Sequence, residues 1–191
     1  MPSPQDPRDF AELVRAHERA VLAYALRRTR TMADAEDAAA ETWTIAWRRR
    51  ESLPADALPW LFATARRVLA NQHRGGRRRH ALLERLRGRA PVEVTETRLG
   101  EPEGPVTRAL EQLRPDDREL LRLVAWEELD HARIAVVLGI SPNAVAIRLH
   151  RARARFAAAY AEVQRAMKDG EGERTHGSMR ATLAGTTERV E

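Results

Sequence analysis

Cysteine is absent from the 191 residues of this chain. Disulfide bonds, thiolate zinc sites and cysteine-based redox sensing are therefore excluded. Lysine is nearly absent too, because Lys168 is the only one and arginine supplies the remaining basic charge. No apolar run approaches the ~20 residues that a membrane-spanning helix needs, and the opening sequence MPSPQDPRDF has no apolar signal core. We therefore expect a cytoplasmic protein that is not inserted in a membrane.

Groups of residues that would support catalysis are also missing. The six histidines are scattered, and the chain has no Gly-rich phosphate loop, no metal-ligand spacing and no pair of carboxylates in an apolar setting. Without a convergent acid, base, nucleophile or metal set, we expect neither an enzyme nor a cofactor.

Basic charge is concentrated in the first half of the chain. The net charge is +5, but residues 1–90 carry +7 and residues 91–191 carry −2. A local surplus of this kind suits a nucleic-acid partner. Arginine binds phosphates and guanine edges through two parallel hydrogen bonds, which also suits DNA. The same bias is expected from a GC-rich genome, and composition favours neither explanation.

Three helices are predicted in the first half. Residues 9–29 form an amphipathic helix, and His17 on its apolar stripe is expected to be packed rather than functional. Residues 33–50 begin with acidic side chains and end with three arginines, which complements the helix dipole. The acidic start either only serves the dipole or forms a docking face for a basic partner, and the charge pattern leaves both open. After a proline-containing loop at 51–59, a third helix covers residues 60–74.

A strongly basic segment continues from this third helix. Residues 66–89 hold nine arginines and two histidines against one acidic residue, Glu84. The helix also carries Asn71 and Gln72 beside arginine, and this mixture is used for base edges together with phosphates. A solvated charged face is the alternative, but the combination favours DNA contact.

The second half begins with a segment that lacks helical periodicity. Residues 88–105 are rich in Pro, Gly, Glu and Thr, which predicts a flexible linker between helical domains at 8–87 and 106–167. Residues 168–191 are polar and weakly periodic, which predicts a disordered tail. The expected fold class is all-α, with two small helical domains of which the second is a helix-turn-helix bundle.

The helix-turn-helix is predicted at residues 130–156. Gly139 follows a short helix where a left-handed residue is needed, Ser141 is a good N-cap, and Pro142 suits the first position of the next helix. No acidic residue occurs from 141 to 161, and the second helix carries arginines opposite an apolar stripe. An ordinary helical hairpin is the alternative. The cap, the turn glycine and a second helix whose charged residues are all basic up to residue 161 favour DNA binding, with that helix in the major groove.

Three motifs occur in a specific order. They are Asp34-Ala35-Glu36-Asp37 with Glu41-Thr42-Trp43 and Ala46-Trp47-Arg48; Trp60-Leu61-Phe62 through Ala65-Arg66; and Leu138-Gly139-Ile140-Ser141 with Val145 and Arg148-Leu149-His150-Arg151-Ala152-Arg153. In this order they resemble a bacterial sigma factor of the extracytoplasmic-function group of the sigma-70 family, over about residues 10–156. A lone helix-turn-helix is weak evidence, but three motifs in sequence are specific.

The resemblance implies a sigma factor that binds core RNA polymerase and directs promoter recognition, melting and transcription initiation. Polymerase-binding residues would be Asp34, Glu36, Asp37, Glu41 and Trp47. DNA-binding residues would be Arg66, Asn71, Arg74, Arg77 and Arg78 at the minus-ten element, and Asn143, Arg148, Arg151 and Arg153 at the minus-thirty-five element. The loop at 51–58 would capture a flipped base. An anti-sigma protein is a further implied partner. The alternative is a helix-turn-helix regulator that does not bind polymerase, which leaves the helix at 33–50 unexplained.

The chain departs from the family pattern in its second half. Ala144, Ala146 and Ile147 stand where polar residues are usual in the recognition helix, and Ala132 and Arg133 stand where two acids are usual. We therefore expect fewer hydrogen bonds to base edges, with apolar contacts to thymine methyls and phosphate contacts remaining. The loop before Trp60 lacks an aromatic stacker, so base capture there would depend on shape and polar contacts.

Overall fold

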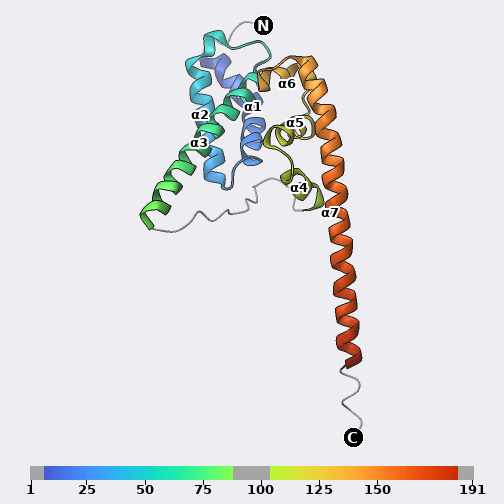
Figure 1. Cartoon of the computed structure of the whole chain (residues 1–191). Helices are drawn as coiled ribbons and strands as arrows, with labels where there is room; N and C mark the ends of the chain where they lie inside the picture. Colours follow the sequence, from blue (N-terminus) through green and yellow to red (C-terminus); the bar gives the residue numbers. More distant parts are fainter. Residues whose placement is uncertain (1–6, 88–103, 185–191) are drawn as a thin grey trace. The chain divides into compact units, whose positions relative to one another are not determined.

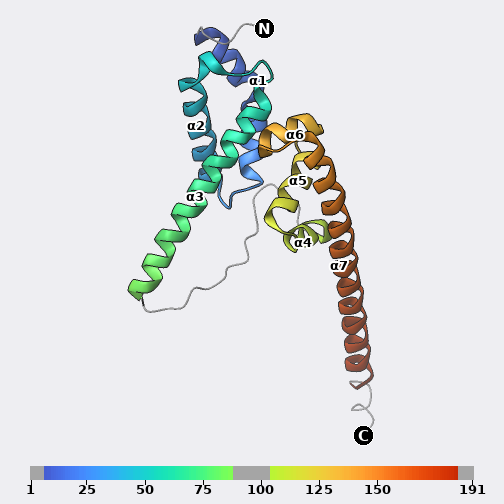
Figure 2. The same ribbon diagram turned by 45° about the horizontal axis from the view of Figure 1, so that its top comes forward.

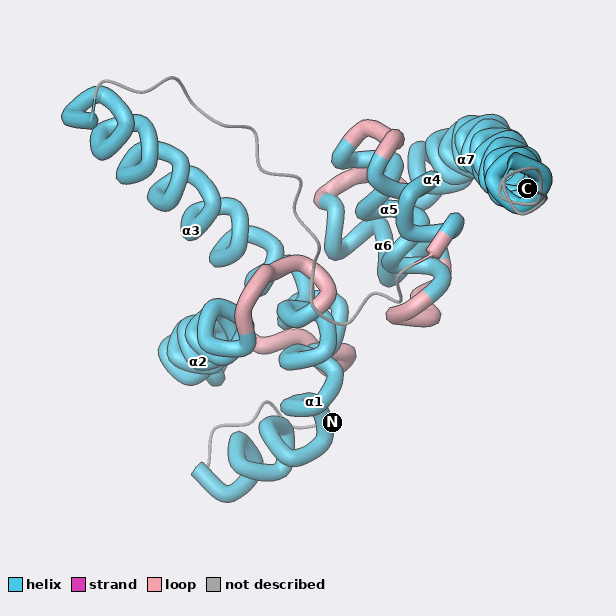
Figure 3. The backbone as a smooth tube through the Cα atoms, turned by 90° about the horizontal axis from the view of Figure 1, so that it is seen from below, coloured by secondary structure: helices cyan, strands magenta, loops and turns pink. Residues whose placement is uncertain are grey.

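The computed structural model describes residues 7–87 and 104–184, and the side chains of residues 8–76 and 104–168. Over these ranges the chain forms seven α-helices and one short 3₁₀ helix, and Figure 3 shows no strand in the part described. The all-α prediction is confirmed. The elements are α1 (Pro7–Leu26), α2 (Met32–Arg48), the 3₁₀ helix η1 (Arg50–Ser52), α3 (Ala57–Arg87), α4 (Pro105–Glu111), α5 (Pro115–Ala125), α6 (His131–Leu138) and α7 (Pro142–Ala184).

The helices group into two compact units. One contains α1, α2, α3 and residues Arg122–Ala146, and the other contains α4, α5 up to Leu121 and α7 from Ile147 onward. The predicted division into domains at 8–87 and 106–167 stays a prediction, and the predicted linker at 88–105 lies almost entirely outside the described residues.

The first unit is built on α1, α2 and α3, which lie side by side (Figures 1 and 2). The alanines at positions 35, 38, 39 and 46 give α2 a smooth buried face, which allows close helix approach. Tyr24 of α1 stacks on Phe62 of α3, with ring centroids 4.8 Å apart and planes 17° from parallel. Both rings are almost fully buried, so this stack fixes the register of α1 on α3. Helix α6 also packs against α3.

The second unit is smaller and is organised by α7. Its buried apolar side chains include Leu110 on α4, Leu113 in the turn after it and Leu120 on α5, together with Ala159 and Val163 on α7. Arg155 donates a hydrogen bond to the carboxylate of Asp117 at 2.7 Å, with the Asp117 side chain only 12% exposed. Short helices such as α4 are not stable alone, so this packing holds them.

Two helices are longer than the sequence predicted. Helix α3 continues to Arg87 through Gly75 and Gly76, where a helix ending near Arg74 was expected. Helix α7 continues to Ala184, where disorder from residue 168 was expected. Glycine costs a helix only about 1 kcal/mol relative to alanine, whereas proline costs about 3 kcal/mol and breaks it. Neither extension contains proline, so each contains residues that weaken a helix but none that breaks it.

No single helix in the described part of the chain is both long and apolar enough to cross a bilayer. By length and composition alone, only α6 taken together with residues Pro142–Lys168 meets that requirement, as a pair bent by 96°.

Candidate functional site

The N-terminus of α2 is closed by a reciprocal cap. The backbone N–H of Asp34 donates to the hydroxyl oxygen of Thr31 at 3.1 Å, and that hydroxyl donates to the Asp34 carboxylate at 2.7 Å. Thr31 has the extended backbone expected of an N-cap. Asp34 therefore contributes to the start of the helix, whatever else it binds.

The remaining acidic residues of α2 face solvent. Glu36, Asp37 and Glu41 are exposed, and none pairs with a basic side chain among those that the structure describes. Asp37 and Glu41 lie four residues apart on one face, where two like charges destabilise a helix by a few tenths of a kcal/mol. A helix that keeps such a face without internal compensation presents a negative surface to a partner.

Trp47 adds an aromatic group near the end of α2. It is 40% exposed, whereas Ala39 and Ala46 on the same helix are buried. One edge packs on Phe10, with centroids 5.0 Å apart, and the Arg50 guanidinium lies 4.6 Å from the ring. A tryptophan held rigidly but left partly open has the properties of an interface anchor.

The outward face of α3 carries the predicted minus-ten residues. Asn71 and Arg74 are exposed, and Arg74 donates a hydrogen bond to the Asn71 side-chain oxygen. Arg66 is half-buried at the edge of this face. Arg67, which the predicted set omits, is exposed and lies two turns before Arg74. The i, i+7 spacing between Arg67 and Arg74 is the sequence signal that could have predicted Arg67 as part of this face. Arg77 and Arg78 belong to α3, but their side chains lie outside those that the structure describes.

The loop predicted to capture a base contains η1 and the residues before α3. Leu53 is buried in the core of the first unit, while Ser52 and Asp56 are exposed. The Asp56 carboxylate accepts a hydrogen bond from Arg133 of α6 at 2.9 Å, with both side chains about half exposed. Exposed pairs of this kind contribute about 0–1 kcal/mol. Base capture by this loop stays a prediction.

The turn between α6 and α7 has the predicted geometry. Asp130 caps α6 by accepting the N–H of Arg133 at 2.8 Å. Gly139 has φ 67° and ψ 38°, the left-handed conformation that ends many helices. The Ser141 hydroxyl then accepts the N–H of Ala144 at 3.2 Å, and Pro142 is the first residue of α7. The predicted cap, turn glycine and N-terminal proline are all confirmed.

The buried and exposed sides of α7 are sharply divided. Val145, Leu149 and Ala152 are at most 2% exposed. All four predicted DNA-binding residues on this helix, Asn143, Arg148, Arg151 and Arg153, are exposed. A helix turns about 100° per residue, which places Asn143 and Arg151 away from the core and Arg148 and Arg153 on opposite flanks. Such an arrangement suits a helix with base contacts at its centre and phosphate contacts beside it.

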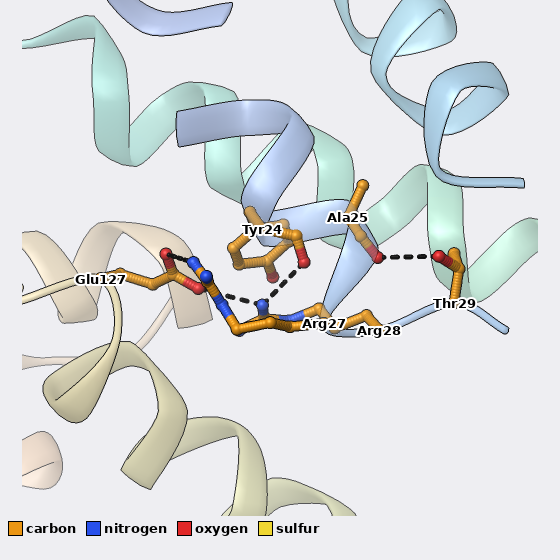
Figure 4. A network of polar contacts seen from close by, with 6 residues as sticks. All are labelled: Tyr24, Ala25, Arg27, Arg28, Thr29 and Glu127. Carbon is orange, nitrogen blue, oxygen red and sulfur yellow. Dashed lines mark hydrogen bonds and ion pairs between the residues drawn. The ribbon is translucent and has the colours of Figure 1, made fainter. Parts of the chain in front are cut away.

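The first unit also contains a buried ionic cluster that the sequence did not predict (Figure 4). Glu127, whose side chain is 2% exposed, accepts hydrogen bonds from Arg27 at 2.6 Å and Arg28 at 3.0 Å. The Arg28 guanidinium also lies 3.5 Å from the centre of the Tyr24 ring and donates to the Tyr24 carbonyl. The partners are about 100 positions apart in sequence, so no local pattern could signal the pairing.

The helix-turn-helix, with no acidic residue from 141 to 161, has the features of a DNA-binding protein. Comparison with known proteins makes the class more specific. Residues 13–79 match the model of Sigma-70 region 2, and residues 104–156 match the model of Sigma-70, region 4.

Relatives and solved structures agree with these matches. The chain is 32% identical to the ECF RNA polymerase sigma factor SigL of Mycobacterium tuberculosis, over 74% of this chain and 85% of SigL. It is also 32% identical to the probable RNA polymerase sigma factor RfaY of Xanthomonas campestris pv. campestris, over 76% of this chain but only 38% of RfaY. The chain shares its fold with the sigma factor RpoE of Bartonella quintana, whose structure was solved in complex with the anti-sigma factor NepR. The TM-score is 0.60 and the sequence identity 22%, and the match covers 80% of this chain and 96% of RpoE. The chain belongs to the ECF group of the sigma-70 family.

Proposed function

We propose that this chain binds core RNA polymerase through the exposed face of α2 and directs it to promoters through α3 and α7. The observation that carries the proposal is the order of the two matched regions, region 2 over residues 13–79 and region 4 over residues 104–156. A helix-turn-helix regulator that does not bind polymerase would not need the first region. In this proposal the chain performs no chemistry itself, and the cytoplasm is the compartment that the function requires.

The docking surface consists of Glu36, Asp37, Glu41 and Trp47. Support comes from a partly exposed tryptophan and three carboxylates on one helix, and these carboxylates pair with no basic side chain that the structure describes. Asp34 is left out of the test because its carboxylate also binds the capping hydroxyl of Thr31. A charge reversal at Asp34 would therefore confound loss of docking with loss of helix stability.

The experiment measures co-elution of the purified chain with core RNA polymerase on gel filtration at moderate salt. Asp37→Arg and Glu41→Arg should each weaken co-elution without lowering the melting temperature, because each replaces a like-charge pair by an opposite-charge pair. Glu18→Arg is the matched control, since Glu18 is an exposed acid on α1, outside the proposed surface. If the control and the α2 variants behave alike, the docking surface is assigned wrongly. If the unsubstituted chain does not co-elute at all, the proposed function itself fails.

DNA contact is divided between two helices in this proposal. Arg66, Arg67, Asn71 and Arg74 on α3 hold the melted minus-ten strand, and Arg77 and Arg78 continue the basic run. Asn143, Arg148, Arg151 and Arg153 on α7 contact the minus-thirty-five duplex. The support is exposure combined with charge of one sign, which supplies most of the salt-dependent affinity for DNA.

An anti-sigma protein is the remaining partner that we propose. The RpoE structure was solved with such a partner, although at 22% identity the likeness concerns the fold alone. Expression of this chain by itself should then give unregulated transcription, which co-expression of the inhibitor reverses. A free chain that is fully active in its native cells under all conditions would contradict this proposal.

A further inference from the structure

Ile147 is an exposed apolar side chain on the face of α7 that points away from the core. It is 47% exposed, whereas Val145 and Leu149 on either side are 0% and 2% exposed. Because a helix turns about 100° per residue, Ile147 lies about 200° from Val145. It is the sixth residue of α7, within the N-terminal part that contacts base edges in a helix-turn-helix. Packing within the described part of the chain does not account for a branched apolar residue there.

The surroundings of Ile147 are polar and positively charged. Asn143 lies one turn before it and Arg151 one turn after it, and both are exposed. No acidic residue occurs between Ser141 and Ala161. This patch therefore has an apolar centre and a positive border, which favours a polyanion over a basic or neutral protein surface.

One apolar group is exposed on the floor of the DNA major groove. It is the C5-methyl of thymine, and it is the feature that distinguishes an A·T pair from the other pairs by apolar contact. Asparagine can bind the N6 and N7 atoms of adenine, the partner of thymine, through two hydrogen bonds. Asn143 and Ile147, one turn apart on the same face, thus suit neighbouring or paired positions in an A·T-containing site.

We propose that Ile147 is a specificity-determining residue that contacts the C5-methyl group of one thymine in the duplex promoter element. The proposal rests on the proposed function, because it needs α7 to enter the major groove. Burial of one methyl-sized group changes affinity by about three- to fivefold. That gain is small for binding in total, but it is selective for one base at one position.

The test removes the methyl group from the DNA and the side chain from the protein. Holoenzyme assembled from the full chain and core RNA polymerase first selects duplexes from a randomised library. Each thymine of the selected duplex is then replaced singly by deoxyuridine, which lacks only the methyl group. We expect one replacement in the duplex element to weaken binding by about three- to fivefold. Ile147→Ala should bind the thymine and uracil duplexes equally, and Ile147→Val should keep part of the difference.

Val106→Ala is the matched control. Val106 is a branched apolar residue that is 42% exposed on α4, so its truncation removes a similar group outside the recognition helix. The control should discriminate thymine from uracil as well as the unsubstituted chain does.

The remaining outcomes separate this inference from the proposed function. If holoenzyme binds the selected duplex and no single uracil weakens it, the inference is overturned while the function stands. The inference is also overturned if Ile147→Ala still discriminates thymine from uracil. It is likewise overturned if the Ile147→Ala variant no longer co-elutes with polymerase, because Ile147 then contacts protein rather than DNA. A chain that forms no holoenzyme overturns both.

Discussion

The buried carboxylate of Glu127 allows a quantitative test of the first unit. Glu127→Gln keeps the shape of the side chain but removes the negative charge that faces Arg27 and Arg28. The three side chains are 2%, 15% and 7% exposed, so water can do little to compensate the two guanidinium groups. Breaking a buried ion pair by removing one partner costs about 3–5 kcal/mol. The amide oxygen still accepts one hydrogen bond, which places the expected loss near the lower end, at about 3 kcal/mol.

The assay is equilibrium unfolding in urea, followed by far-ultraviolet circular dichroism. With a denaturant slope of about 1–3 kcal/mol per molar urea, the loss corresponds to a midpoint lower by about 1–3 M. Glu128→Gln is the control, because Glu128 is the next residue and carries the same group in an exposed position. It should leave the midpoint unchanged. Equal midpoints for the two variants would refute the view that the Glu127 cluster stabilises the unit.

Three further predictions concern the turn, a histidine and the DNA surface. Gly139→Ala should destabilise the chain by about 1 kcal/mol in thermal unfolding, because φ is 67° and an added Cβ meets no atom, so that only backbone strain is involved. Gly139→Asn should cost less, because asparagine tolerates the left-handed conformation better. Equal costs for the two variants would contradict the strain argument. Burial lowers the pKa of His17 from 6.5, and the nearby Asp56 carboxylate opposes this effect. The unfolded chain therefore binds a proton at His17 more readily than the folded chain does. The stability that neutral His17 contributes is complete above pH 6.5 and is lost as the pH falls below that value. His17→Gln should flatten the pH dependence of the melting temperature in that range, and an unchanged profile would exclude His17 as its source. Arg148→Ala with Arg151→Ala should reduce the slope of log affinity for duplex DNA against log salt by roughly 0.9 per lost phosphate contact, and an unchanged slope would exclude those contacts.

Local signals were sufficient for most of the fold and for the helix-turn-helix. The cap at Ser141, the glycine at 139 and the proline at 142 act within a few residues of each other, so the sequence predicts their conformations directly. The alternation of buried and exposed residues along α7 follows from helical periodicity for the same reason.

Features that depend on distant residues could not be predicted in this way. The pairing of Arg27 and Arg28 with Glu127 joins positions about 100 residues apart, and none of the three has an unusual local setting. The bond between Thr31 and Asp34 is local but was also missed, because the helix was expected to begin at residue 33 rather than at Met32; the acidic start was predicted to serve either the helix dipole or docking. The length of α7 was underestimated because residues 168–191 are polar and weakly periodic, and helical periodicity was the signal used to predict helices.

The near absence of lysine has a consequence for both regulation and experiment. Acetylation neutralises lysine, but it leaves the arginines on α3 and α7 charged, so this modification cannot weaken the proposed DNA contacts. Lys168 is the only side-chain amine, and it is exposed on α7. At 1.5 Å per residue it lies about 39 Å along the helix from Pro142. With the N-terminal α-amine blocked, an amine-reactive dye on Lys168 would therefore lie at a fixed distance from the start of the recognition helix. Energy transfer to labelled DNA would then follow docking of that helix without any engineered cysteine.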